Sequence, residues 1–164
     1  MTEEQRGRDR DTAGRARNAR PRDELGRPLP RSAAQDGPRV PDDLVISPAE
    51  AADLGGRLLA EGRPFHAHEV FEAAWKSVPG QERELWRGLA QVAVGLTHAR
   101  RGNASGAISL LRRGAGHVAE FADAPGEVDA GFVAAQATGL ALRIERDGLA
   151  TVTEADLRLR LNPA

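Results

Sequence analysis

The sequence predicts an all-α fold, a compact antiparallel bundle of about five helices behind a disordered N-terminal tail. Three observations support this prediction. From Leu44 onward, apolar residues recur at intervals of three and four, which is the spacing of one helical face. Short breaks containing proline, glycine or asparagine separate these segments, and short connections favour antiparallel neighbours. No segment shows the alternation that is typical of a β-strand.

The chain divides into a predicted tail, residues 1–43, and a predicted helical bundle domain, residues 44–164. The tail is rich in arginine, aspartate and proline and has almost no large apolar residues. Such a segment cannot bury enough surface to offset the conformational entropy that ordering would cost. An arginine-rich arm that contacts RNA or DNA is the alternative, but interspersed acids such as Asp9 and Asp11 weaken it.

The amino-acid composition argues against several classes of function. The 164 residues carry 23 basic and 24 acidic side chains, so no net field favours nucleic acid or an anionic membrane. The absence of cysteine removes disulfides, thiolate zinc sites and thiol nucleophiles. No apolar run resembles a secretory signal or approaches the roughly 20 residues that span a bilayer. We therefore expect a cytoplasmic protein that binds neither membranes nor nucleic acid.

Five helices and a short sixth are predicted. Ser47, Pro48 and Glu50 form a helix start, with serine as the N-cap, and that helix ends near Glu61. Asn103 is a good N-cap for the fourth helix, and Thr153 for the short sixth. The remaining predicted ranges are 64–78, 81–101, 104–123 and 127–147 for the second to fifth helices.

The second helix carries the candidate chemistry. At 100° per residue, Phe65, His68, Glu72 and Trp75 fall on one face, and Glu69 lies at its edge. The opposite side is apolar as well, and a helix that is apolar on both sides is usually buried. We therefore expect His68 and Glu72 to be buried and paired, since they are four residues apart. His66 lies off this face and is expected to be half-exposed.

The third helix offers possible partners for this pair. Arg87, Gln91 and His98 follow a second stripe, distinct from the leucine face. If the two stripes face each other, they form a network of His68, Glu72, Gln91 and His98, with Glu69 and Arg87 beside it. His117 flanks the apolar stripe of the fourth helix and is expected to reach solvent.

Two interpretations of this network remain open. The first is a metal or acid–base site in which His68, Glu72 and His98 hold a divalent ion and Glu69 acts as the base. The spacing falls short of the His-Glu-x-x-His motif, because Glu72 occupies the place of the second histidine. The second interpretation is a satisfied polar network that fixes the register of the helices. No Walker loop or dinucleotide glycine fingerprint occurs, so no cofactor-binding residue is predicted, and a divalent metal is the possible cofactor.

Three motif blocks resemble a known family. They are Phe65-x-x-His68-Glu69-x-x-Glu72-x-x-Trp75, Gly88-Leu89-x-Gln91-x-Ala93 and His98-x-x-Arg101-Gly102-Asn103-x-x-Gly106-Ala107. Their order and spacing over about residues 48–125 resemble the domain of unknown function family numbered 309. The resemblance implies a small helical bundle of bacterial and archaeal proteins with no settled activity. It also implies that His68, Glu69, Glu72, Trp75, Gln91 and His98 are motif positions. Some family members carry the loose label of metal-dependent hydrolase.

The sequence thus leaves the function open between two classes. One is an enzyme with a metal-dependent, hydrolase-like site at the His/Glu centre. The other is a non-enzymatic helical module that binds a protein or associates with itself, because Trp86 and the many alanine and glycine faces suit close helix packing. A homo-oligomer is compatible with either class.

Overall fold

The computed structural model describes Arg27 and residues 40–41, 43–121, 124 and 127–163. The predicted disordered tail, residues 1–43, lies almost wholly outside this described part, although Val40 near its end is buried against the core. Five α-helices follow, and the all-α prediction is confirmed: α1 (Pro48–Ala60), α2 (Pro64–Ser77), α3 (Arg83–Arg100), α4 (Ala104–Val118) and α5 (Ala130–Asp147). The described residues contain no β-strand.

The helix starts follow the sequence signals. Ser47 and Glu50 form a reciprocal capping box at α1, with the Glu50 amide donating to Ser47 Oγ at 3.2 Å. At α4, the Gly106 amide donates to Asn103 Oδ1 at 3.0 Å. The later boundaries differ from the prediction, since α4 ends at Val118 and α5 begins at Ala130. The predicted short sixth helix is a pair of 3-10 turns, η2 (Leu149–Thr151) and η3 (Ala155–Leu157).

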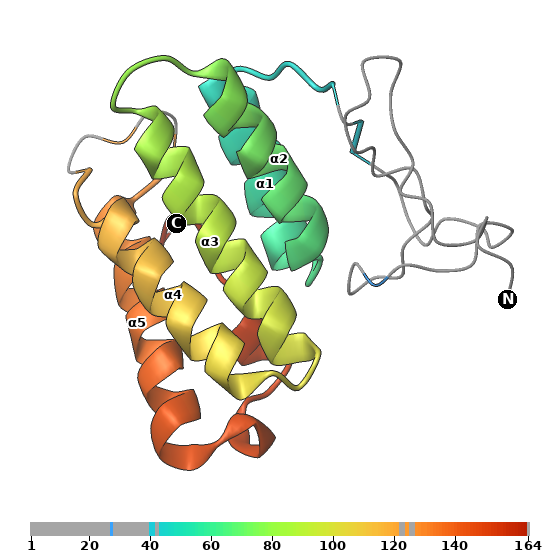
Figure 1. The fold of residues 1–164 in the computed structure, drawn as a ribbon, viewed down its shortest axis with the longest axis vertical. Helices are drawn as coiled ribbons and strands as arrows, with labels where there is room; N and C mark the ends of the chain where they lie inside the picture. Colours follow the sequence, from blue (N-terminus) through green and yellow to red (C-terminus); the bar gives the residue numbers. More distant parts are fainter. Residues whose placement is uncertain (1–26, 28–39, 42, 122–123, 125–126, 164) are drawn as a thin grey trace, which may run out of the picture.

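Each helix packs against the next one along the chain, so the bundle is a row of antiparallel neighbours (Figure 1). The central helix, α3, has α2 on one side and α4 on the other, and its Leu85, Trp86 and Leu96 are completely buried. The C-terminal segment returns beside α5 and α1. The Asp129 amide donates to the Leu161 carbonyl at 2.8 Å, and Leu159 and Leu161 enter the core.

Glycines let α3 and α4 approach closely. A Cβ at Gly114 would lie 2.7 Å from the carbonyl oxygen of Gly88, and a Cβ at Gly95 would lie 3.0 Å from the Leu111 amide nitrogen. Because these neighbours are backbone atoms, they cannot turn away as a flexible side chain could. The seam between α3 and α4 therefore requires small residues at these positions.

In the part of the chain that the structure describes, no helix has the length and apolar character that crossing a membrane requires.

Candidate functional site

A ladder of polar side chains, one imidazole, one carboxylate and one ammonium group, runs along the outer edge of α2. His68 Nε2 lies 3.3 Å from Glu72 Oε2, and Lys76 Nζ lies 3.1 Å from Glu72 Oε1. The three residues are spaced four apart, so each lies one helical turn above the last. Pro64, with its fixed φ, occupies the first position of the helix. The predicted contact between His68 and Glu72 is therefore present.

The pair is less buried than predicted. The His68 side chain is 24% exposed and that of Glu72 is 38% exposed. The buried side of α2 is the small apolar one, where Ala67, Val70 and Ala74 are fully buried. Phe65 and Trp75, on the face of the pair, are only partly buried. The expectation of burial was wrong because α2 packs mainly against α1 and α3 in the described part of the chain, and this leaves one side of it near solvent.

The hydrogen bond between His68 and Glu72 determines which atoms of the two side chains donate and accept. The hydrogen bond with His68, and to a lesser extent Lys76, lowers the pKa of Glu72 to about 2, against the opposing effect of its partial burial. The carboxylate is then ionised at neutral pH and can only accept hydrogen bonds. In the neutral imidazole, the proton must therefore sit on Nε2, which leaves the lone pair on Nδ1. Nδ1 is itself covered from solvent and has no hydrogen-bond partner among the described residues.

Two aromatic rings flank the pair. The centroid of the Phe65 ring lies 5.8 Å from that of the His68 ring, in a tilted arrangement. At the other end, the Arg83 guanidinium carbon lies 5.2 Å from the centroid of the Trp75 ring, within cation–π range. Trp75 Nε1 is also covered and has no hydrogen-bond partner in the described part of the chain. The site thus consists of the two aromatic rings, the His68 imidazole held by Glu72, and the indole N–H of Trp75, which donates no hydrogen bond within the described residues.

The other predicted network members make local contacts. His117 Nδ1 lies 2.7 Å from Gln91 Oε1, which ties α4 to α3. His98 Nδ1 lies 3.1 Å from Asn103 Nδ2 at the turn between these helices. Arg87 donates to Glu84 at 3.5 Å. Gln91, His98 and Arg87 thus have partners of their own on α3 and α4.

The structure brings together only two of the side chains that were predicted to bind a metal ion. Within the described residues, no three histidine, aspartate or glutamate side chains lie close enough together to hold one ion. The donors that meet are His68 and Glu72. Glu69, the predicted base, is half-buried one position after His68.

Two histidines lie where the sequence analysis did not expect them. His66 is 1% exposed, rather than half-exposed, and its Nε2 lies 3.5 Å from Arg63 Nη2. Its spacing of four from the buried Val70 could have placed it on the inner face. His117 is partly buried against Gln91 rather than extended into solvent. The signal for that contact was absent, because Gln91 belongs to another helix.

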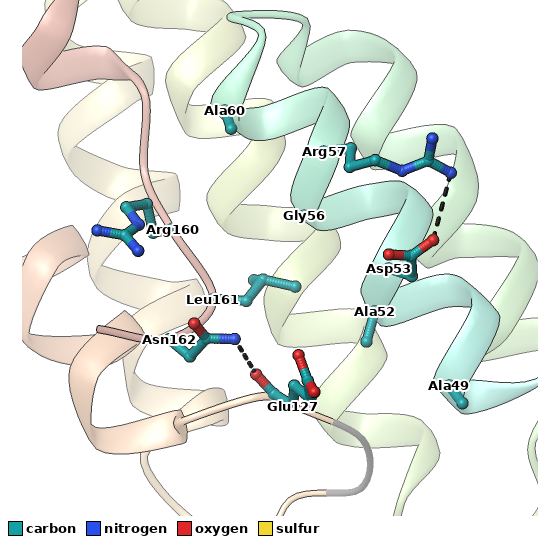
Figure 2. Close-up of a pocket in the computed structure, with 10 residues that line it drawn as sticks. All are labelled: Ala49, Ala52, Asp53, Gly56, Arg57, Ala60, Glu127, Arg160, Leu161 and Asn162. Carbon is teal, nitrogen blue, oxygen red and sulfur yellow. Dashed lines mark hydrogen bonds and ion pairs between the residues drawn. The ribbon is translucent and has the colours of Figure 1, made fainter. Parts of the chain in front are cut away.

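A separate cleft lies between α1 and the C-terminal segment (Figure 2). Its volume is about 480 Å³, a size that suits a small molecule. The α1 wall consists of Ala49, Ala52, Gly56 and Ala60, and Leu161 faces it from the C-terminal segment. Figure 2 also shows Arg57 turned toward Asp53, to which it is paired at 3.3 Å. None of the predicted site residues lines this cleft.

Comparison with known proteins connects α2 and α3 to one family. Residues 53–110 match the family model described as "Domain of unknown function (DUF309)". The chain is also similar to the uncharacterized protein YpuF of Bacillus subtilis (strain 168), with 44% identity over 48 residues. This match covers 29% of the chain and 28% of YpuF, so the similarity spans under a third of the relative's length. No solved structure shows significant similarity to the chain. The resemblance in the motif blocks is thus confirmed, and the helices that carry His68, Glu72 and His98 lie in the segment that matches the DUF309 family model.

Proposed function

We propose that the outer edge of α2 is a proton-transfer site for a small, largely apolar substrate. His68 is the base and accepts the proton at Nδ1. Glu72 is a positioning residue that holds Nε2 and stabilises the imidazolium once the proton has moved. This is the division of labour in every carboxylate–histidine pair that performs acid–base chemistry.

The observation that carries the proposal is the unpartnered Nδ1. A covered polar atom without a hydrogen bond costs stability, so the fold gains nothing by leaving it unpaired. Glu72 leaves the lone pair on that atom. The His68 side chain is 24% exposed but Nδ1 itself is covered, so a substrate reaches that atom once the side chains that cover it move aside. Phe65 and Trp75 give that substrate apolar surface on either side.

A metal-dependent hydrolase is the more specific form of this proposal. It would use His68, Glu72 and His98 as ligands and Glu69 as the base. His98 lies against Asn103, and no three donors gather in the described part of the chain. The geometry therefore gives better support to proton transfer by His68 alone. The two forms of the proposal can be distinguished by experiment. The metal-dependent form requires His98 and an added divalent ion for activity, whereas proton transfer by His68 alone requires neither.

A nitrobenzisoxazole is a suitable probe, because removal of one C–H proton breaks its N–O bond and releases a coloured phenolate. We expect the full chain to accelerate this ring opening beyond the buffer rate, and His68→Asn to abolish the acceleration. Glu72→Gln should lower the rate by about 100-fold, a typical contribution of a group that orients a base. Absorbance of the phenolate measures all three rates.

Glu84→Gln is the matched control, since Glu84 is also a half-exposed, ion-paired carboxylate but lies on α3 beside Arg87. It should leave the rate unchanged. No acceleration over buffer by the wild-type chain would contradict the proposal, as would equal rates in the wild type and His68→Asn. Loss of activity in His98→Asn together with dependence on zinc or manganese would favour the metal-dependent form instead.

A further inference from the structure

A shallow apolar groove runs between α4 and α5 on the face away from α3. Its volume is about 590 Å³. Seven of its lining residues are apolar, among them Ala115, Gly116, Ala119, Ala135, Gly139 and Leu142. Arg112 lines one end, where it pairs with Glu145 of α5.

No neighbour in the described part of the chain explains the glycines of this groove. Among the described residues, a Cβ at Gly116 or Gly139 would meet nothing within 4 Å, in contrast to Gly114 of α4, whose Cβ would meet the backbone of α3. Glycine within a helix lowers stability relative to alanine. Gly114 is explained by the close approach of α3, and Gly116 and Gly139 lack any such neighbour. An object outside the chain that approaches the backbone closely would explain both.

The groove also carries a side chain that fits it. Leu142 is 52% exposed and is one of two large hydrophobic residues, with Val45, that are exposed in the described part of the chain. It lies one helical turn from Gly139. Consider a second copy related to the first by a two-fold axis. Leu142 of the second copy can enter the space above Gly139 and Gly116 of the first copy, and Leu142 of the first copy enters the equivalent space on the second. A two-fold axis makes such a contact self-complementary.

Charges on α4 and just beyond its end match the same arrangement. Arg112 lies four residues before Gly116, and the exposed Glu120 lies four residues after it, two positions past the end of α4. When two α4 helices cross antiparallel at Gly116, Arg112 of one copy, which is 44% exposed beside Glu145, also comes near Glu120 of the other, and this occurs twice. Within one chain Arg112 pairs with Glu145 and not with Glu120.

We propose that the α4–α5 groove is a dimer interface whose occupant is a second copy of this chain. The two α4 helices cross at Gly116, and Leu142 of each copy fills the space above Gly116 and Gly139 of the other copy. Arg112 of one copy pairs with Glu120 of the other across the interface. The interface lies away from α2, so it is independent of the proton-transfer site.

Sedimentation equilibrium of the full chain tests the proposal, and we expect a dimer. Gly116→Leu and Leu142→Glu should each give a monomer with an unchanged helical circular dichroism spectrum, because both positions face solvent within one chain. Val45→Glu is the matched control, since it removes the other exposed hydrophobic residue and should leave the dimer intact. A wild-type chain that stays monomeric up to millimolar concentration overturns the proposal, and so does a dimer that survives Gly116→Leu.

A double-mutant cycle tests the orientation. Arg112→Ala and Glu120→Ala should each weaken dimerisation several-fold, and the double variant should be no weaker than either single variant, because both changes remove the same contact. Additive losses would show that the two residues do not meet and would overturn the antiparallel crossing. The cycle is informative because the two side chains lie too far apart to couple within one chain.

Discussion

The seam between α3 and α4 and the outer edge of α2 are built on different principles. At the seam, Gly88, Gly95 and Gly114 bring two backbones together and Leu85, Leu96 and Leu111 fill the remaining space. At the edge of α2, a ladder of an imidazole, a carboxylate and an ammonium group is partly exposed to solvent. The seam depends on shape and tolerates almost no added atom. The edge depends on polar contacts and carries two covered ring nitrogens that have no partner among the described residues.

This difference separates the source of stability from the source of chemistry. Close packing buries apolar surface and supplies most of the free energy of folding. Half-exposed ion pairs supply little, because solvent screens them and ordering the side chains costs entropy. A contribution to stability is therefore a poor explanation for the His68, Glu72 and Lys76 side chains at the edge of α2. For this reason we place the function there. Substitutions in the two regions should differ accordingly.

Gly114→Ala should have the largest effect. The new Cβ would lie 2.7 Å from the Gly88 carbonyl oxygen and 2.8 Å from the Val92 amide nitrogen, so one helix must shift. We expect the free energy of unfolding to fall by about 2 kcal/mol despite the better helix propensity of alanine. Urea unfolding at neutral pH measures it.

Gly116→Ala is the control for this comparison, because its Cβ would lie more than 4 Å from every atom of the described residues. In dilute protein it should raise the free energy of unfolding by up to about 1 kcal/mol. If both substitutions destabilise the chain equally, the contrast between a packed and an open helix face disappears.

Asn103→Ala should have an intermediate effect. Asn103 Oδ1 accepts a hydrogen bond from the Gly106 amide at the start of α4, and its amide contacts His98 at the end of α3. Loss of the N-cap should cost about 1 kcal/mol in urea unfolding. Asn103→Ser, which keeps a capping oxygen, should recover most of that loss. A cost that serine does not recover would mean that the contact with His98, and not the cap, stabilises this turn.

The two regions also differ in how far the sequence could predict them. Caps at Ser47 and Asn103 and the breaks between helices are local signals, so the sequence predicted the helix starts and the all-α fold. The His68–Glu72 contact is also local, since i and i+4 always meet on a helix. These features follow from spacing along one segment.

Contacts between helices could not be predicted in the same way. Gln91 was expected to face Glu72, but the rotation of α3 directs it to His117 of α4. The burial of His66 depends on which side of α2 meets its neighbours, and periodicity does not distinguish two apolar faces. Gly88 and Gly114 appear as ordinary helix residues until α3 and α4 are placed together. Packing partners, unlike spacing, depend on the whole bundle.

Glu72→Gln should have the smallest effect on stability, and its dependence on pH identifies the cause. The pKa of Glu72 falls from its ordinary 4.5 to about 2 in the folded chain, chiefly through its hydrogen bond with His68. The carboxylate then stabilises the fold fully above pH 4.5, and this contribution is lost as the pH falls toward 2.

The full shift would correspond to about 3 kcal/mol, but the side chain is 38% exposed and solvent screens the pair. We therefore expect Glu72→Gln to cost about 0.5 kcal/mol at neutral pH. Urea unfolding of the two proteins at several pH values should show the difference shrinking through the acid range. A loss as large as that of Gly114→Ala would show that the edge of α2 stabilises the bundle as strongly as the seam does, and the separation of chemistry from stability would fail.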